Sequence, residues 1–136
     1  MEELNKPVNV YGAAVHQSGA LIIDDEPDIC YLLQQILSRH GIRSSRVESI
    51  QEARTMLQSG QQYSIIILDN HLPDGMGVDF AAEIREQYPQ ARLIMITAHD
   101  SDIDRRKARA NGVDFFIAKP FSGETISALL TLPAAK

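Results

Sequence analysis

The sequence is short of cysteine and of long apolar runs, and each shortage excludes a class of protein. Cys30 is the single cysteine, so a disulfide within the chain and a cysteine-rich zinc site are both excluded. We expect Cys30 to be a small buried hydrophobe on a helix. No apolar run approaches the ~20 residues of a membrane span, and no basic segment precedes an apolar one at the start, as in a secretion signal. We therefore expect a cytoplasmic protein without a membrane partner.

Basic residues are also in short supply. The 136 residues include 13 lysines and arginines against 18 aspartates and glutamates, a net charge of −5, and the pI is about 5.3. This balance argues against direct nucleic-acid binding, because proteins that bind nucleic acids usually carry a basic patch. No helix-turn-helix pattern follows the alternating strands and helices described below. The length suits one domain, and a hydrophobic share of 44% is enough for one core.

From residue 19 onward, short apolar runs alternate with helical spacing. The apolar runs cover residues 20–23, 44–47, 65–68, 92–96 and 115–118. The helical segments that follow them cover residues 27–40, 49–60, 78–88, 101–110 and 122–130. This alternation predicts an α/β fold, a doubly wound five-stranded parallel sheet with helices on both faces.

We expect one domain at residues 19–132, with a weakly structured leader at 1–18 and a tail at 133–136. The leader contains Val8, Val10 and Val15 around Tyr11. An edge strand and a loose segment are both consistent with that pattern.

Polar side chains follow four of the apolar runs. The first run is followed by Asp24 and Asp25, the third by Asp69, the fourth by Thr97, and the fifth by Lys119 and Pro120. Because parallel strands end at a common edge, where ligands bind in such sheets, these side chains are expected to meet there. In the sheet order 2-1-3-4-5, Asp69 neighbours the acidic pair and Thr97, and Lys119 reaches back across roughly 10 Å.

Three neighbouring carboxylates repel one another. Two like charges 4 Å apart cost roughly 4 kcal/mol at an effective dielectric of 20, and a hard divalent cation relieves that repulsion. We expect Mg²⁺, which accepts few protein ligands together with water and phosphate oxygens. A carboxylate between Mg²⁺ and a lysine is well placed to attack a phosphoryl group.

Four segments carry a family resemblance: LIIDDEPDI, IIILDNHLPDGMG, LIMITAH and FFIAKPF. In this order and spacing they resemble the receiver domain of bacterial two-component response regulators, a flavodoxin-like (CheY-like) fold, over about residues 20–130. The resemblance implies that Asp69 accepts the phosphoryl group, that Asp24 and Asp25 bind Mg²⁺, and that His71 offers its backbone carbonyl to the metal. It further implies Thr97 and Lys119 as phosphoryl contacts, Thr97 and Phe116 as switch residues, and a cis bond between Lys119 and Pro120.

The resemblance also implies partners. A sensor histidine kinase or a histidine phosphotransfer protein would donate the phosphoryl group, and the face formed by helix 4, strand 5 and helix 5 would then bind a downstream protein effector. Pairing of two copies through that face stays open, as does whether the chain stands alone or belongs to a larger regulator or hybrid kinase.

Three features depart from the commonest pattern of the family. His71 and His99 lie two residues past Asp69 and Thr97, and they either tune the lifetime of the phosphoryl group or are solvated loop histidines. Phe116 either moves as a switch or belongs to the strand core, and it lacks the hydroxyl of a tyrosine.

Three other functions compete with a phospho-accepting receiver. A hydrolase of the haloacid dehalogenase kind would need a second Asp where His71 stands. A flavodoxin-like cofactor binder would need a phosphate loop where the acidic Asp24-Asp25-Glu26 run stands. A receiver that acts as a scaffold without phosphorylation would have lost the acids or the lysine. We therefore expect a signalling domain that catalyses its own phosphorylation and dephosphorylation, and no turnover enzyme.

Overall fold

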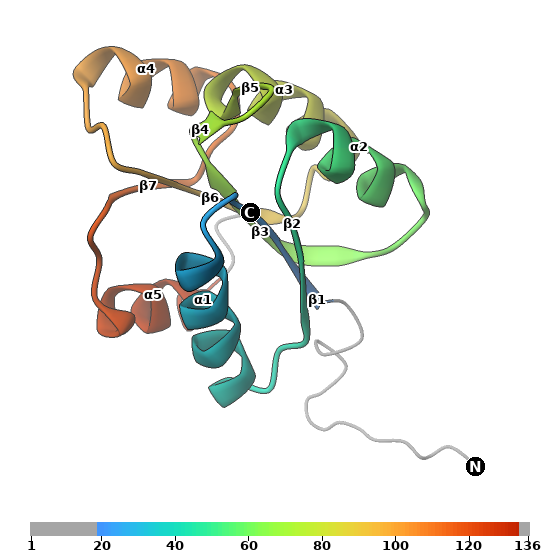
Figure 1. The fold of residues 1–136 in the computed structure, drawn as a ribbon, viewed down its shortest axis with the longest axis vertical. Coiled ribbons are helices and arrows are strands. Elements are labelled where there is room, and N and C mark those ends of the chain that lie inside the picture. Colours follow the sequence, from blue (N-terminus) through green and yellow to red (C-terminus); the bar gives the residue numbers. More distant parts are fainter. Residues whose placement is uncertain (1–18, 134–136) are drawn as a thin grey trace.

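The computed structural model describes residues 19–133, which form a parallel sheet between two layers of helices (Figure 1). The strands are β1 (Gly19–Ile23), β2 (Ser44–Val47), β3 (Tyr63–Asp69), β4 (His71–Leu72), β5 (Gly75–Met76), β6 (Arg92–Thr97) and β7 (Phe115–Ala118). The helices are α1 (Pro27–Arg39), α2 (Ile50–Gln58), α3 (Gly77–Gln87), α4 (Asp102–Ala110) and α5 (Gly123–Leu130). The predicted leader, residues 1–18, lies outside the described residues, as do residues 134–136.

The strand order confirms the predicted fold class. Within residues 19–133, the main sheet has the order β2-β1-β3-β6-β7, and every neighbouring pair is parallel. Counted along the main sheet, this is the expected order 2-1-3-4-5. The register aligns Asp69 with Ile96 and Thr97 with Ala118, so the carboxyl ends of the central strands lie level with one another.

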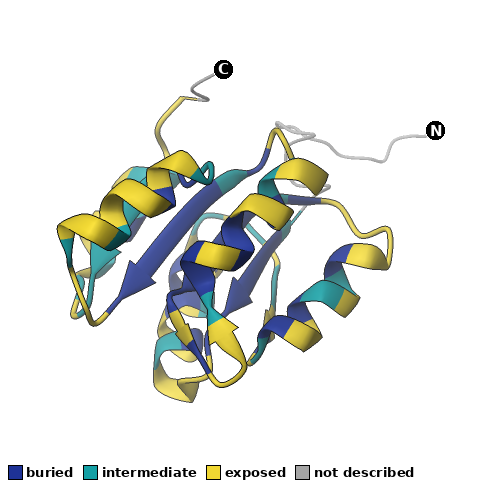
Figure 2. Cartoon of the chain, turned by 90° about the horizontal axis from the view of Figure 1, so that it is seen from above, coloured by how far each residue is buried: buried dark blue, intermediate teal, exposed yellow. Residues whose placement is uncertain are grey.

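Apolar side chains fill both faces of the sheet, because buried parallel strands carry them on alternate sides. One face packs with α2, α3 and α4 around Ile66, Leu68 and Leu93. The other packs with α1 and α5 around Ile67, Ile94 and Ile126. Figure 2 shows the buried strands between helices whose outer surfaces are exposed. None of the helices between residues 19 and 133 is long and apolar enough to cross a bilayer.

Two local features differ from expectation. The spacing of Ser49 and Glu52 predicts a capping box at the start of α2. Ser49 does accept a hydrogen bond from the Glu52 N–H at 3.1 Å, but the Glu52 carboxylate accepts from the N–H of Glu48, at 2.7 Å, and not from that of Ser49. The small hairpin of β4 and β5 was not predicted. Its turn residue Asp74 accepts hydrogen bonds from the N–H groups of Ile50 and Gln51 at 2.8 and 3.0 Å, which holds the hairpin to the start of α2 and lowers the pKa of Asp74.

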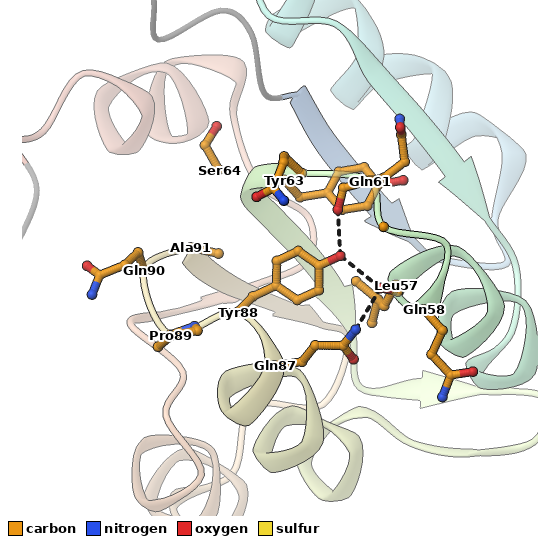
Figure 3. A pocket seen from close by; sticks show the side chains of 12 residues that line it. Leu57, Gln58, Gln61, Tyr63, Ser64, Gln87, Tyr88, Pro89, Gln90 and Ala91 are labelled. Carbon is orange, nitrogen blue, oxygen red and sulfur yellow. Dashed lines mark hydrogen bonds between the residues drawn. The ribbon is translucent and has the colours of Figure 1, made fainter.

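A hollow of about 500 Å³ lies at the amino-terminal edge of the sheet, at the opposite ends of the strands from Asp69 (Figure 3). The Tyr88 hydroxyl lies 2.9 Å from the carbonyl of Leu57 and 2.7 Å from that of Gln61, and Gln87 Nε2 donates to the same Leu57 carbonyl at 2.7 Å. These contacts join the end of α2 to the end of α3. The polar groups therefore serve the packing of the two helices.

Gly77 allows α3 to approach the end of β3 closely. A Cβ atom at this position would collide with the backbone carbonyl of Asp69, with the Asn70 Cα next nearest at 3.0 Å. The Gly77 N–H donates to the Asn70 carbonyl at 2.7 Å. Because the obstacle is backbone, a side chain here would displace the segment that carries Asp69.

We expect Gly77→Ala to lower the free energy of unfolding by about 1–3 kcal/mol, because the overpacked site must shift. The measurement is urea unfolding. Gly123→Ala is the matched control: Gly123 is also the first residue of a helix, and its Cβ would meet Ile36 at an ordinary 3.7 Å. A destabilisation equal in the two variants would contradict the close approach described here.

Candidate functional site

The carboxyl ends of four strands bring the predicted site residues together. Asp69 ends β3 and Thr97 ends β6, while the acidic pair follows β1 and Lys119 follows β7. Asp24, Asp69 and Thr97 are buried, although they are polar. Buried polar groups at one edge of a hydrophobic core are costly, so this concentration marks the edge as a chemical site.

The three predicted carboxylates form a cluster. One oxygen each from Asp24, Asp25 and Asp69 lies within 4.8 Å of the others. Asp24 and Asp69 are buried, and Asp25 is exposed at the mouth. Asp24 Oδ1 accepts from the Glu26 N–H at 2.8 Å, and Asp24 Oδ2 is approached by the Lys119 ammonium at 3.1 Å but by no backbone donor among the described residues. Hard oxygen donors with a spare buried lone pair are a set that a divalent cation fits.

Lys119 places an ammonium among these carboxylates. Its Nζ lies 2.6 Å from Glu26 Oε1, 3.1 Å from Asp24 Oδ2 and 3.5 Å from Asp69 Oδ2. The side chain is 11% exposed, and its peptide bond to Pro120 is cis. Glu26, which sequence reasoning treated as part of an acidic run, therefore makes the shortest contact with the lysine.

Burial and charge shift the proton affinities of the site. Burial raises the pKa of Asp69 to about 6, with the Asp24 charge adding to the rise and the Lys119 ammonium opposing it. Burial likewise raises the pKa of Asp24. Burial alone would lower the pKa of Lys119, but the hydrogen bond to Glu26 and the charges of Asp24 and Asp69 outweigh it, so that pKa is raised. The lysine is therefore a permanent cation in the neutral pH range.

Cys30 lies beneath the site on α1. Its thiol donates to the carbonyl of Asp24 at 3.2 Å, and burial, with a smaller contribution from the Asp24 charge, raises its pKa to about 11. The expectation of a small buried residue on a helix is confirmed.

The Thr97 hydroxyl faces the loop that follows β6. It accepts from the His99 N–H at 3.1 Å. The rings of His71 and His99 meet edge to face, with centroids 4.6 Å apart. Both histidines are exposed, and each lies two residues past a buried residue of the site, Asp69 or Thr97.

Phe116 lies on the α4 side of the sheet, and Phe115 packs on the opposite side. The Arg105 guanidinium sits 4.8 Å from the centre of the Phe116 ring. Asn70, a fully buried polar residue beside Asp69, was missed by sequence reasoning. A polar residue between a strand-ending aspartate and a turn gave no sign of burial.

Comparison with known proteins gives a consistent result. The family described as the response regulator receiver domain matches residues 20–131. The response regulator protein PilR of Pseudomonas aeruginosa is 37% identical over 101 residues, 74% of this chain and 22% of that protein. The transcriptional regulatory protein SrrA of Staphylococcus aureus is 35% identical over 102 residues, 75% of this chain and 42% of that protein. The chain thus spans less than half the length of these relatives.

Solved structures share the fold. A two-component response regulator from Clostridium difficile superposes with a TM-score of 0.79 at 28% identity, covering 84% of this chain and 93% of that one. A response regulator from Burkholderia pseudomallei, solved with a phosphorylated aspartic acid, a calcium ion and citrate, gives 0.78 at 27% identity, covering 87% and 69%.

We expect Asp69→Asn to raise the free energy of unfolding of the metal-free chain at pH 7.5 by about 1–3 kcal/mol, because the pKa of Asp69 is raised from 3.8 to about 6 in the folded state. A raised pKa means that the folded state binds the proton more tightly than the unfolded state between pH 3.8 and about 6. The ionised wild-type carboxylate is therefore destabilising above that window, and the advantage of the variant should shrink as the pH falls through it.

Urea unfolding of both chains at several pH values in a chelator measures the difference. Glu86→Gln, an exposed charge removal on α3, is the control and should change stability little. An advantage of Asp69→Asn that is constant from pH 7.5 to pH 4 would contradict the raised pKa.

Proposed function

The chain belongs to the receiver domain family of response regulators, the aspartate-phosphorylated domains of two-component signalling, and we propose that Asp69 is the aspartate that is phosphorylated. One observation supports this choice most directly. Asp69 is the buried carboxylate that the Lys119 ammonium and the acidic pair both approach. Asp24 shares the burial and lies nearer the ammonium, at 3.1 Å, but its Oδ1 accepts a short hydrogen bond of 2.8 Å from the Glu26 N–H. The corresponding contact of Asp69 Oδ1, with the His71 N–H, is longer, at 3.5 Å.

The transfer needs an oxygen nucleophile and charge neutralisation. A carboxylate oxygen of Asp69 forms a bond to phosphorus, and the bond from phosphorus to the imidazole nitrogen of a donor phosphohistidine breaks. The imidazole leaves with the electron pair and takes up a proton, and Asp69 becomes an acyl phosphate. Such transfer depends on positioning and electrostatics more than on covalent catalysis, which suits a site whose groups are held by strand ends.

A divalent cation completes this electrostatic arrangement. Asp24, Asp25 and Asp69, with the backbone carbonyl of His71, are the groups that would hold it, and we favour Mg²⁺ because the protein donors are few and all oxygen. When bound, the cation neutralises charge on the phosphoryl oxygens. With the cation bound, the pKa of Asp69 would fall below about 6, which would keep the carboxylate ionised and nucleophilic in mildly acidic solution as well.

Lys119 and Thr97 would respond to the new charge. A phosphoryl group adds about −1.5 to −2 charge at pH 7, and the ammonium is already within 3.5 Å of Asp69 Oδ2. The Thr97 hydroxyl would leave the loop to bond a phosphoryl oxygen, and Phe116 would repack into the space behind it. Two charge-assisted contacts at roughly 1.5–3 kcal/mol each approach the 5.5 kcal/mol that moves a two-state equilibrium from 1:99 to 99:1.

The proposed partners follow from this chemistry. A histidine kinase or histidine phosphotransfer protein donates, and a protein effector reads the face formed by α4, β7 and α5. We assign no nucleic-acid contact to the described residues, since the net charge of the chain is −5. The relatives PilR and SrrA are much longer than the matched region, so the activities of those whole proteins are not assigned to this chain.

A hydrolase that turns over small phosphates is the rival function. It would need a second aspartate, acting as general acid, two residues after the nucleophile. That position is His71, whose exposed ring lies against His99. The arrangement favours a domain that holds its own phosphoryl group over an enzyme acting on external substrates.

We expect incubation with acetyl phosphate and Mg²⁺ to add one phosphoryl group to the chain, and Asp69→Asn to abolish the gain because it removes the nucleophile. Intact-mass spectrometry measures both. Asp102→Asn, an exposed aspartate of α4, is the matched control and should be phosphorylated like the wild type. Phosphorylation that persists in Asp69→Asn would refute the assignment, and release of phosphate over many turnovers would favour the hydrolase.

The histidine pair generates a separate expectation. If the two imidazoles restrict water at the mouth of the site, His71→Ala and His99→Ala should each lose the phosphoryl group faster than the wild type. Mass spectra taken over time after removal of the donor would show this. His40→Ala, which changes a histidine on the far end of α1 bonded to Ser127, is the control. Unchanged lifetimes in both variants would make the pair two solvated loop histidines.

A further inference from the structure

Asn70 follows Asp69 directly and is fully buried. Its N–H donates to the carbonyl of Ile96 at 3.2 Å, and its own carbonyl accepts from Gly77 at 2.7 Å. Its side-chain Oδ1 accepts from the N–H of Val78 at 2.9 Å. Asn70 thus joins the acceptor segment, which is the end of β3 with Asp69 and the following Asn70, to β6 and to the start of α3.

The other end of the same amide reaches α4. Asn70 Nδ2 donates to Asp104 Oδ2 at 3.2 Å, across 34 residues of sequence. Asp104 lies in the first turn of α4, where its N–H donates to the capping Ser101 hydroxyl at 3.1 Å. Bonds to a charged acceptor are among the stronger hydrogen bonds in proteins, and this one is partly buried.

The rest of α4 is weakly anchored. Within this helix, which is described throughout, Ala108 alone is buried, and Ile103 is 70% exposed. Lys107 pairs with Asp79 at 2.7 Å, but both side chains are at least half exposed, and such pairs contribute little. A helix with few buried contacts opens at a low free-energy cost, so a single partly buried bond has a large share in holding it.

The carboxyl end of α4 has its own attachment. Asn111 Nδ2 donates to the carbonyl of Val78 at 2.6 Å, and Arg105 covers Phe116. Neither contact involves the residue next to Asp69. Among the hydrogen bonds of the described residues, the one from Asn70 to Asp104 is therefore the one that connects α4 directly to the acceptor segment.

We propose that Asn70 is a positioning residue that couples the phosphorylation site to α4 through its hydrogen bond to Asp104. The bond holds the first turn of α4 in the resting position. A phosphoryl group on Asp69 adds negative charge one residue away, which disfavours the nearby Asp104 carboxylate and weakens the bond. The resting-state part stands on the structure alone, and the response to phosphorylation rests on the proposed function.

Hydrogen exchange of the α4 amides tests the bond in the unphosphorylated chain. Asp104→Ala removes the acceptor, and Asp102→Ala is the matched control, because both aspartates lie in the first turn and contribute similarly to the helix dipole. We expect exchange in Asp104→Ala to be about 3- to 10-fold faster than in the control, as loss of one hydrogen bond would give. Equal exchange in the two variants would overturn the proposal.

Asp104→Asn separates the hydrogen bond from the charge. Its amide oxygen can still accept from Asn70, so its exchange should return toward that of the control. Exchange as fast as in Asp104→Ala would mean that the charge, and not the bond, holds the helix, which overturns the assignment.

The coupling is tested by comparing each chain before and after acetyl phosphate, with intact mass as the measure of phosphorylation. In the wild type, phosphorylation should speed α4 exchange. In Asp104→Ala the added effect should be lost, while phosphorylation itself becomes about 3- to 10-fold faster, because the bond no longer opposes the activated state. An unchanged response in Asp104→Ala would overturn the coupling. A wild-type mass that never increases would overturn the proposed function instead, and the exchange comparison would still decide the resting bond.

Discussion

The Lys119 ammonium stands against Asp24, Asp69 and Glu26 at distances of 2.6 to 3.5 Å, and the site depends on that balance of charge. Removing the ammonium would leave buried carboxylates without a compensating charge, which is strongly destabilising. The cluster in the described residues still has more carboxylates than ammonium groups, and the Asp24 charge adds to the rise in the pKa of Asp69 that burial causes. An excess of carboxylates favours the binding of a cation, and this is the electrostatic basis of the function proposed above.

The fold supplies the geometry that makes the cluster possible. Parallel strands end at one edge, and the register sets β3, β6 and β7 level there, so side chains far apart in sequence meet without long loops. The helices then close the two faces of the sheet and leave this edge open. Gly77 and Asn70 let α3 begin directly against the end of β3.

Much of this could be predicted from the sequence, because its signals are local. Continuous apolar runs located the buried strands, and the strand-ending acids, Thr97 and Lys119 located the edge. The β4–β5 hairpin was missed because two-residue strands carry no periodicity. The contact of Glu26 with Lys119 and the burial of Asn70 were missed because each depends on a partner that only tertiary packing brings near. The domain limits and the roles of the individual site residues remain predictions.

The single native thiol has a practical consequence. Cys30 is buried, donates to a backbone carbonyl, and has a pKa of about 11, so almost none of it is thiolate at neutral pH, and the thiolate is the form that reacts with alkylating reagents. A cysteine introduced on the outer surface of α4 would therefore be labelled selectively. Fluorescent or spin probes can thus report on this helix in a chain that keeps all of its native residues in the core.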